Sequence, residues 1–599
     1  MNVTCIDCET YDPYLKIDGP GAVYGRSHLI GVALGDLQHQ EYIPIGHEGA
    51  TNTPKEEAIE IINKFLASGS PIVGAKILYD LEQLAVFGCK IPEKATFLDV
   101  QYAEALLEED GTYNLEYLAQ KYGSTKTTTS LEESYADMFN VPLAKVNRDQ
   151  VYKVLAILPL KIVSDYAKQD VKATLEVLDK QLPLIQNQGL RNLFDMECSL
   201  IYVLHRMRMQ SIDIDLGKLN ELYRIAYSGI ATIESKYSQL LSLRSANCLG
   251  SFLLENGIQV PINHNTKSSC RYLITRQWLK EFNGHDTTGI IKDVLEYREL
   301  LKLKNTFLDS YLLKRIQKDN ENIYPRIHPL FHPLKGDQYG TVAGRFSSSN
   351  PNLQNIPMAG KQPIGQVRNI FVPKKEEEWV KIDRSQIEYR LLVNYASGQG
   401  ADAARRAYVR DPNTDFHKFV MGLTGLDRKS AKVCNFLLVY GGSVAKLIKI
   451  SGLDPIKCEG IYNTYHEKLG FVRATYKIFQ SRAFMNEEIR TLTGRRRKFS
   501  NGNQYKALNA FIQGTAADIM KIDMYSLWTF GLYDEIGYPL LTVHDELDFS
   551  VPINKLKILK EAKSILENIY KKYTADIKVP LLVNFSKGPN WGQQEDIKV

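Results

Sequence analysis

The stretch Leu541-Thr-Val-His-Asp-Glu-Leu-Asp-Phe-Ser550 places the acids Asp545 and Glu546 at the break between two strand-like halves. A second stretch, Trp379-Val-Lys-Ile-Asp383, is strand-like and ends in an acid. Two carboxylates presented by rigid strands can bind a pair of Mg²⁺ ions, one activating an attacking oxygen and one stabilising a departing pyrophosphate. The two stretches therefore favour nucleotidyl transfer, although capping and turn roles explain most acids that follow a strand.

The segment from Arg428 to Gly441 strengthens this interpretation. Arg428, Lys432, Phe436 and Tyr440 recur every fourth residue, so they lie along one face of a predicted helix. Two cations followed by two aromatic rings suit an incoming nucleotide, with the cations on the triphosphate and the rings near the sugar and base. The alternative is an amphipathic surface helix.

The first part of the chain, to about residue 185, alternates strand-like and helical segments, which predicts an α/β domain. Asp7 and Glu9 lie two apart on a strand, so both side chains point to one face and can bind the same metal pair. Asp80 follows a strand-to-helix switch, and Tyr166 and Asp170 stand one helical turn apart.

Length and composition set the limits. A chain of 599 residues is too long for one core, so at least two folding units are expected. The net charge of +5, from 74 Lys and Arg against 69 Asp and Glu, is a weak argument for a polyanionic partner. Cys5 and Cys8 form a lone pair without the second pair of a zinc site, and we interpret them as reduced strand residues.

The amino terminus has acids and no long apolar run, which predicts neither a signal peptide nor a transit peptide. We expect no membrane span, since no stretch reaches the required length of about 18 apolar residues. The expected location is the cytoplasm of a bacterium or a phage-infected cell.

Asp383-Arg-Ser-Gln-Ile-Glu388-Tyr-Arg390 resembles motif A of family A DNA polymerases, Arg428 to Gly441 resembles motif B, and His544-Asp545-Glu546 resembles motif C. The segment from Thr341 to Pro357 is similar to the primer-template contact segment of that family, and Asn509 to Asp518 to its minor-groove segment. In the first half, the acids and Tyr166 resemble the three motifs of DnaQ-like 3′-5′ exonucleases. The resemblance covers nearly the whole chain, with the motifs in the family's order.

The fold that this resemblance implies is an α/β multidomain chain, a ribonuclease-H-like 3′-5′ exonuclease domain followed by a right-hand polymerase domain. The exonuclease would occupy residues 1–185 and the polymerase 186–599. Within the polymerase we expect the thumb at about 190–330, the palm at about 331–400 and 500–599, and the fingers at about 401–499.

The resemblance also assigns site residues and two Mg²⁺ ions to each active site, with Mn²⁺ as an alternative. Asp383 and Asp545 would be metal ligands of the polymerase, with Glu546 supporting the primer end. The exonuclease metals would be held by Asp7, Glu9, Asp80 and Asp170, while Tyr166 orients the attacking water. The nucleotide pocket would comprise Arg368, Glu388, His417, Arg428, Lys432, Phe436 and Tyr440. The contacts to primer and template would come from Arg345, Gln354, Asn355, Asn509, Gln513 and His544.

Two of these positions bear on substrate choice. In the family, a glutamate at the position of Glu388 helps to close the space that a ribose 2′-hydroxyl needs, which implies deoxynucleotides. Phe436 stands where the family uses Phe or Tyr, and a phenolic hydroxyl there can replace the missing 3′-hydroxyl of a chain terminator. We therefore expect discrimination against dideoxynucleotides.

The sequence departs from the family pattern at several positions. Tyr505, beside Lys506, stands where an Arg is usual, and Leu437 replaces a common Gly. Lys76 and Ala75 occupy the positions where the second exonuclease motif normally carries Asn. These departures put one primer-template contact and the single-strand binding or rate of the exonuclease in doubt.

Two other functions remain as alternatives. A single-subunit RNA polymerase shares the palm chemistry but would lack the exonuclease and Glu388, and a silent DNA-binding scaffold should have lost at least one acid of each site. The expected partners are primer-template DNA and deoxynucleoside triphosphates, with no membrane. We expect a monomer of phage replicative type, without a processivity-factor insertion in the thumb. The run Arg495-Arg-Arg-Lys498 has two interpretations, a phosphate contact or a solvated loop.

Overall fold

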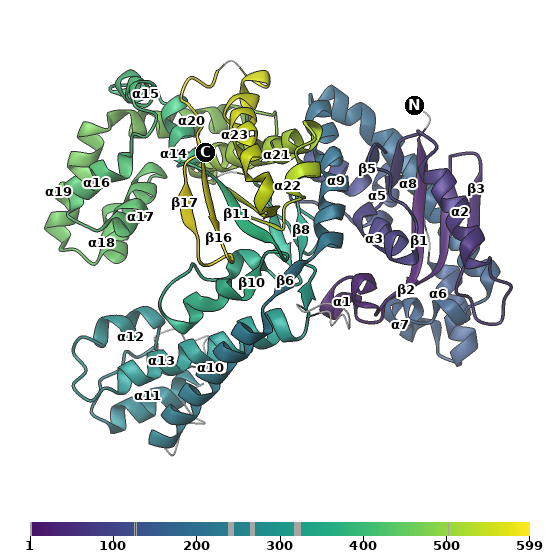
Figure 1. Ribbon diagram of the computed structural model, residues 1–599, viewed down its shortest axis with the longest axis horizontal. Coiled ribbons are helices and arrows are strands. Elements are labelled where there is room, and N and C mark those ends of the chain that lie inside the picture. Colours follow the sequence, from purple (N-terminus) through teal and green to yellow (C-terminus); the bar gives the residue numbers. More distant parts are fainter. Residues whose placement is uncertain are drawn as a thin grey trace.

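The computed structural model describes residues 3–124, 126, 128–237, 245–263, 270–316, 325–500, 502–574 and 576–599. Two sheets lie side by side, each covered by helices (Figure 1). A helical arm extends below the second sheet, and a further group of helices extends beside it (Figure 1). Within the described ranges, no helix combines the length and the apolar character needed to cross a bilayer.

The first sheet has the strand order β3-β2-β1-β4-β5. Its strands are β1 (Thr4–Tyr11), β2 (His28–Gly35), β3 (Gln40–Pro44), β4 (Ile72–Gly74) and β5 (Phe97–Asp99). The first three pair antiparallel, whereas β4 and β5 run parallel to β1. Parallel neighbours need crossover connections, which the helices between these strands supply. The order gives the α/β sheet that the alternating segments predicted.

Eight helices surround this sheet. They are α1 (Leu15–Asp18), α2 (Lys55–Leu66), α3 (Ile77–Phe87), α4 (Val100–Leu107), α5 (Leu115–Tyr122), α6 (Thr129–Phe139), α7 (Arg148–Tyr152) and α8 (Leu160–Asn187). The longest, α8, packs against β1, β2 and β3 and so brings its own side chains to the acids of β1. The boundary expected at residue 185 lies in the last turn of this helix.

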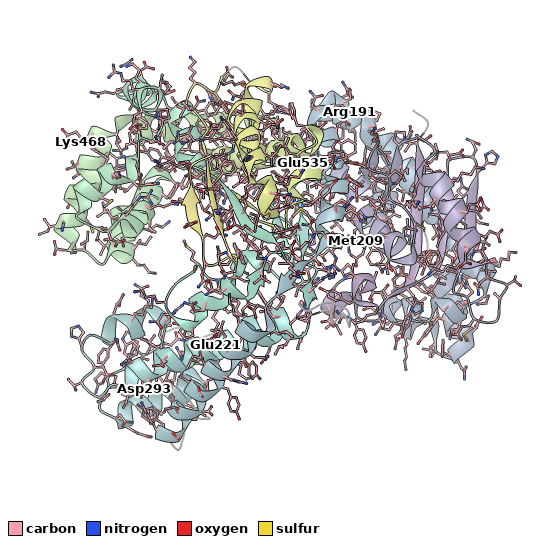
Figure 2. All side chains as sticks on the ribbon, viewed as in Figure 1. Arg191, Met209, Glu221, Asp293, Lys468 and Glu535 are labelled. Atoms are coloured by element: carbon pink, nitrogen blue, oxygen red, sulfur yellow. The ribbon has the colours of Figure 1, made fainter. Side chains whose placement is uncertain are left out.

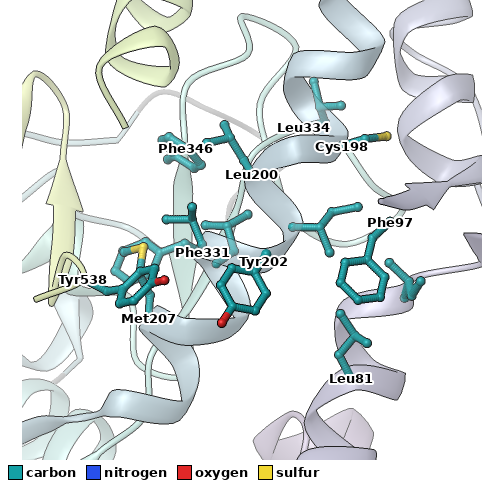
Figure 3. Packing of buried hydrophobic residues seen from close by; sticks show 14 of the residues in the cluster. Leu81, Phe97, Cys198, Leu200, Tyr202, Met207, Phe331, Leu334, Phe346 and Tyr538 are labelled. Carbon is teal, nitrogen blue, oxygen red and sulfur yellow. The ribbon is translucent and has the colours of Figure 1, made fainter. Parts of the chain in front are cut away.

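Helix α9 (Arg191–Gln210) lies between the two sheets, with Leu81 and Phe97 of the first domain on one side and Phe331 and Phe346 on the other (Figure 3). Buried residues account for 13 of its 20 positions, so it is apolar on more than one face and suits an interior place. The thumb expected from about residue 190 includes this helix. The arm instead begins after α9, because α9 buries its faces against both domains.

The arm is formed by α10 (Leu216–Lys236), α11 (Ala246–Glu255), α12 (Arg276–Phe282) and α13 (Ile290–Lys302), which continues as the π-helix η5 (Leu303–Leu313). It has a small core of its own, built around Leu249, Leu253, Ile291 and Tyr297. At its base, β6 (Ile212–Ile214), β7 (Arg326–Ile327) and β10 (Phe371–Val372) form a sheet of order β10-β6-β7. In Figure 2, Glu221 and Asp293 mark the arm, and Arg191 and Met209 mark the two ends of α9.

The second sheet has the order β14-β15-β11-β16-β17 and is antiparallel throughout. Its strands are β11 (Glu377–Arg384), β14 (Leu541–Val543), β15 (Glu546–Pro552), β16 (Val583–Gly588) and β17 (Glu595–Ile597). Helix α21 (Ala507–Thr529) is buried along most of its length, beside α9, α14 (Ile387–Asn394) and α23 (Leu559–Asn568). The short helix α22 (Tyr533–Ile536) packs on β15.

The helical group beside this sheet follows α14 along the chain, and Lys468 marks its outer side in Figure 2. It comprises α15 (Ala401–Arg410), α16 (Phe416–Thr424), α17 (Arg428–Val439), α18 (Val444–Ser451), α19 (Pro455–Lys468) and α20 (Gly470–Asn486). Two two-stranded sheets complete the chain, β8 (Leu330–His332) with β9 (Ser347–Ser349) and β12 (Glu488–Arg490) with β13 (Arg496–Lys498).

Candidate active sites

The register of the second sheet brings its acids together. Asp383, near the end of β11, pairs directly with Glu546 at the start of β15. Asp545 lies in the turn that joins β14 to β15, where His544 adopts φ +58°. The backbone carbonyl of Asp545 accepts a hydrogen bond from the Arg384 N–H at 3.0 Å. Burial, followed by the charges of Asp545 and Glu546, raises the pKa of Asp383 to about 7. Such mutual repulsion is what a divalent cation would relieve, so the acids fit a metal site.

Further charged groups surround these acids. The Lys381 Nζ lies 3.9 Å from one oxygen of Glu546, and an Arg368 nitrogen lies 3.7 Å from the other. The Arg368 guanidinium also lies over the Trp591 ring, 4.1 Å from its centroid. Asp548 is fully buried opposite Lys381 and accepts a 2.6 Å hydrogen bond from the Trp379 indole. Sequence reasoning missed Lys381, although its spacing of two from Asp383 places both on one face of β11.

Helix α17 presents the face that the four-residue spacing predicted. Phe436 and Tyr440 stack with ring centroids 6.1 Å apart, and the Lys432 Nζ lies 5.9 Å from the Phe436 ring. The positive charge of Lys432 lowers the pKa of both Asp383 and Asp545, against the larger effect of burial. Arg428 donates to Asp415, at 2.9 and 3.1 Å. Of the two cations on this face, Lys432 therefore acts on the acids of the second sheet, whereas Arg428 is paired with Asp415.

His417 is fully buried behind this face. Its Nδ1 lies 3.0 Å from the amide nitrogen of Asn435, whose oxygen accepts a 2.7 Å hydrogen bond from Tyr465. Its ring centroid lies 5.5 Å from that of Phe436. Burial lowers the pKa of His417 to about 4, so the ring is neutral near pH 7. Asn435 and Tyr465, which sequence reasoning missed, hold this histidine.

Glu388 connects α14 to two of the other predicted residues. It forms an ion pair with Arg345, and its second oxygen accepts a 2.8 Å hydrogen bond from the Tyr440 hydroxyl. The three side chains come from segments far apart in the sequence, so this contact fixes a glutamate carboxylate beside the aromatic end of α17.

The remaining residues predicted to contact DNA lie on several separate segments. The Gln354 amide donates to the backbone oxygens of Phe346 and Thr542, at 3.0 and 3.2 Å, which ties this segment to β14. Asn355 and His544 are exposed. Asn509 and Gln513 are half-buried and one turn apart on α21, so they share a face.

The departures from the family pattern also have defined surroundings. Tyr505 is half exposed, with the Lys506 ammonium 5.4 Å from its ring centroid. Leu437 lies against Gly442, where a Cβ atom would meet the Leu437 side chain at 2.3 Å. The larger residue at 437 is therefore matched by a glycine at 442.

The first domain gathers a second set of acids. Asp7, Glu9 and Asp170 can each offer an oxygen such that all three lie within 4.8 Å of one another. Asp80 is buried nearby and accepts a 3.0 Å hydrogen bond from the Cys8 N–H. Burial, followed by the charge of Asp170, raises the pKa of Asp7 to about 7. Strand β1 and helices α3 and α8 thus supply an all-oxygen donor set, which suits Mg²⁺ or Mn²⁺.

A lysine that sequence reasoning missed lies among these acids. The Lys126 ammonium forms an ion pair with Asp170 and donates to the Tyr166 hydroxyl at 3.3 Å. Burial lowers the pKa of Lys126, but the contact with Asp170 more than offsets this and the pKa is raised overall. The Tyr152 hydroxyl lies 3.4 Å from that of Tyr166. The predicted water-orienting tyrosine is therefore held on two sides.

The basic run Arg495–Lys498 is not a solvated loop. It belongs to the β12–β13 hairpin and faces the first domain, where Arg497 lies 3.3 Å from Glu109 and Lys498 3.4 Å from Glu108. Arg495 is buried between Glu197 and Asp518. The solvated-loop interpretation was wrong because the acids that pair with this run lie far from it in the sequence, whereas the phosphate contact stays a prediction.

Comparison with known proteins identifies the family. Residues 218–593 match DNA polymerase family A. The chain belongs to this family. Residues 20–186 match a 3′-5′ exonuclease family, so the polymerase carries an exonuclease domain. This agrees with the fold and activity implied by the resemblance, and it favours a DNA polymerase over the RNA polymerase alternative.

Relatives of the polymerase occur in phages and bacteria. It is 28% identical to a DNA-directed DNA polymerase of Pseudomonas phage M6, over 98% of this chain and 93% of that protein. It is 25% identical to the DNA polymerase DpoZ of Acinetobacter phage SH-Ab 15497, over 95% of each chain. It is 29% identical to DNA polymerase I of Chloroflexus aurantiacus, of which it spans 60%.

A solved structure shares the fold. The polymerase domain of Pol1 from M. smegmatis, in complex with a DNA primer-template and dNTP, superposes with a TM-score of 0.72 at 23% identity. The match covers 94% of this chain and 93% of that one. At this identity the likeness concerns the arrangement of the elements.

Proposed function

We propose that this enzyme replicates phage DNA by adding deoxynucleotides to a primer 3′ end in the palm and removing mispaired ends in the exonuclease domain. The proposal rests chiefly on the sheet register that brings Asp383, Asp545 and Glu546 together beside the cationic face of α17. Residues 1–185 would be the exonuclease, and the acting form would be a monomer in the bacterial cytoplasm, without a processivity factor on the thumb.

In the palm, Asp383 and Asp545 would hold two Mg²⁺ ions, with Mn²⁺ as a substitute. When bound, such ions activate the primer 3′ oxygen and stabilise the departing pyrophosphate. Lys432 would bind the triphosphate together with Arg428, which first has to exchange its Asp415 partner for phosphate. Phe436 and Tyr440 would pack on the nucleotide, with the buried His417 behind them.

Selection of deoxynucleotides would come from Glu388. Arg345 and Tyr440 hold its carboxylate in place, so the side chain cannot turn aside for a 2′-hydroxyl without breaking two contacts. The primer and template would be contacted by Asn509, Gln513, Gln354, Asn355 and His544. Glu546, held between Arg368 and Lys381, would support the primer end.

In the exonuclease domain, Asp7, Glu9, Asp80 and Asp170 would hold two divalent ions. Tyr166 would orient the water that attacks the terminal phosphodiester. Its hydroxyl is near both Lys126 and Tyr152, which restricts the directions in which it can donate.

Extension of a mismatched primer with all four deoxynucleotides tests both sites at once. The wild-type enzyme should excise the mismatched nucleotide before elongating, and only when Mg²⁺ is present. Asp7→Asn should extend a matched primer normally but leave the mismatch in place. Failure of the wild type to extend any primer in Mg²⁺ would instead support the alternative of a silent DNA-binding scaffold.

A further inference from the structure

Lys126 is a buried cation inside the exonuclease carboxylate cluster. Its side chain is 7% exposed, as is that of its partner Asp170. The ammonium also lies 4.9 Å from the centroid of the Tyr166 ring, whose hydroxyl it contacts. Burying a lysine costs free energy unless it is paired, and here the partners are a predicted metal ligand and the predicted water-orienting residue. This is not the environment of a lysine that only aids solubility.

Ser124 and Thr128, each two positions from Lys126, are anchored. The Ser124 hydroxyl donates to Glu176 on α8, and the Thr128 hydroxyl donates to Glu132 on α6 at 3.0 Å. Thr128 is itself buried. Two residues near Lys126 in the sequence are thus hydrogen-bonded to the helices α8 and α6.

A count of charges indicates what the lysine does during the reaction. Asp7, Glu9, Asp80 and Asp170 contribute four negative charges, which two divalent ions would balance. The phosphodiester of a bound strand then adds one negative charge, and Lys126 supplies one positive charge at the same place. An ammonium displaced from Asp170 by a divalent ion can then pair with this phosphate.

The surroundings leave room for a strand end. Tyr166 lines a pocket of about 400 Å³ together with Lys168 and Lys172 and the acids Asp165 and Glu176. The two lysines come from α8, the helix that also carries Tyr166 and Asp170. Two acids match these lysines, and a single-stranded 3′ end can reach Tyr166 through this pocket.

We propose that Lys126 is a phosphate-binding residue of the exonuclease site, exchanging Asp170 for the scissile phosphodiester when divalent ions and a 3′ end are bound. The assignment rests on the proposed exonuclease function. It adds a cation to a set of catalytic residues that otherwise consists of four acids and a tyrosine.

Three substitutions in the full-length enzyme test the proposal. Lys126→Met removes the charge and keeps the length, Lys126→Arg keeps the charge, and Lys121→Met removes a different lysine of the same domain, one paired with Glu104. Excision would be followed on a single-stranded oligonucleotide with a fluorescent base at its 3′ end. We expect Lys126→Met to be at least about tenfold slower than wild type, Lys126→Arg to retain more activity, and Lys121→Met to stay within about twofold.

A binding measurement separates phosphate contact from mere support of the fold. Two oligonucleotides are compared in Ca²⁺, one with a normal terminal phosphodiester and one with a neutral methylphosphonate there. Wild type should prefer the charged linkage, and Lys126→Met should reduce that preference by about tenfold. Loss of the same factor for both oligonucleotides, or excision by Lys126→Met within twofold of wild type, would overturn the assignment.

The two proposals fail in different ways. A wild-type enzyme that excises normally but is matched by Lys126→Met refutes only the role of Lys126. A wild-type enzyme that does not excise at all, and that Asp7→Asn leaves unchanged, refutes the exonuclease function and the role of Lys126 together.

Discussion

The two carboxylate clusters of the enzyme differ in how close their compensating cations lie. In the exonuclease domain, Lys126 contacts Asp170 itself. In the palm, Lys381 and Arg368 contact Glu546, and within the described part of the chain neither Asp383 nor Asp545 has an ion pair with Lys or Arg. The two scaffolds thus differ in where they place positive charge, which lies inside the first cluster and at the margin of the second.

The largest effect on activity is expected from removing one acid from each cluster. Asp383→Asn should slow primer extension by a factor on the order of 10³, about 4 kcal/mol in activation free energy, and leave excision unchanged. Asp7→Asn should do the reverse, because each set of acids serves its own site. Steady-state extension and excision assays measure both rates, and loss of both activities in either variant would contradict two independent sites.

A second test concerns the connection between the two domains. Glu197 on α9 is buried and accepts a 2.6 Å hydrogen bond from Lys521 as well as an ion pair from Arg495. Glu197→Gln leaves the buried Lys521 without its counter-charge and Arg495 with Asp518 alone, so we expect a loss of about 3 kcal/mol in the free energy of unfolding, measured in urea. The matched control Glu535→Gln breaks an exposed ion pair with Lys555 and should cost less than about 1 kcal/mol. Equal effects would show that the buried network is not what joins the domains.

A buried histidine of α9 makes the stability of the enzyme depend on pH. His205 on α9 is 4% exposed, and burial lowers its pKa to about 4, from an ordinary value of 6.5. The unfolded chain therefore binds the proton more readily, and this contribution to stability is present above pH 6.5 and lost as the pH falls toward 4.

His205→Gln removes that pH dependence. Between pH 7 and pH 5 the wild type should lose about 2 kcal/mol more stability than this variant, measured by urea unfolding at each pH. Other groups titrate equally in both proteins, so the difference isolates one side chain. A constant difference between the two proteins would show that His205 is accessible to protons in the folded state.

The smallest expected effect concerns the face of α17. Phe436→Tyr adds one hydroxyl to a ring that stacks on Tyr440 and lies beside His417. Incorporation of dideoxynucleotides relative to deoxynucleotides should rise by at least about tenfold, equivalent to about 1.4 kcal/mol, because the hydroxyl can take the place of the missing 3′-hydroxyl. Competition between the two substrates in one extension reaction measures the ratio. Equal use of both substrates by the wild type would refute the expectation.

The sequence predicted those features that depend on a short repeating spacing of residues. The spacing of Arg428, Lys432, Phe436 and Tyr440 predicted a helical face, because periodicity of this kind is visible within a few residues. The family resemblance then supplied the right-hand arrangement. The pairing of Asp383 with Glu546 depends on a register between strands more than 160 positions apart, which no local pattern specifies.

The residues that sequence reasoning missed either have partners far away in the sequence or stand alone without a repeating spacing. Lys126 stands alone in a polar stretch between two helices, with no spacing that relates it to Asp170, 44 positions later. The run Arg495–Lys498 looked like a phosphate-binding loop because its partners at 108–110 precede it by nearly 400 positions. Asn435 and Tyr465 gave no signal beyond ordinary polar helix residues.

The hairpin β12–β13 and helix α9 have a consequence for how a primer end passes from synthesis to repair. Ion pairs along the hairpin and a continuous hydrophobic core join the exonuclease domain to the palm, so hinge bending between them would break buried contacts (Figure 3). The distance between the two sites is then a constant of the enzyme. The frequency of excision would then depend on how readily the last base pairs of the primer melt, because only the separated primer strand moves from the palm to the exonuclease site.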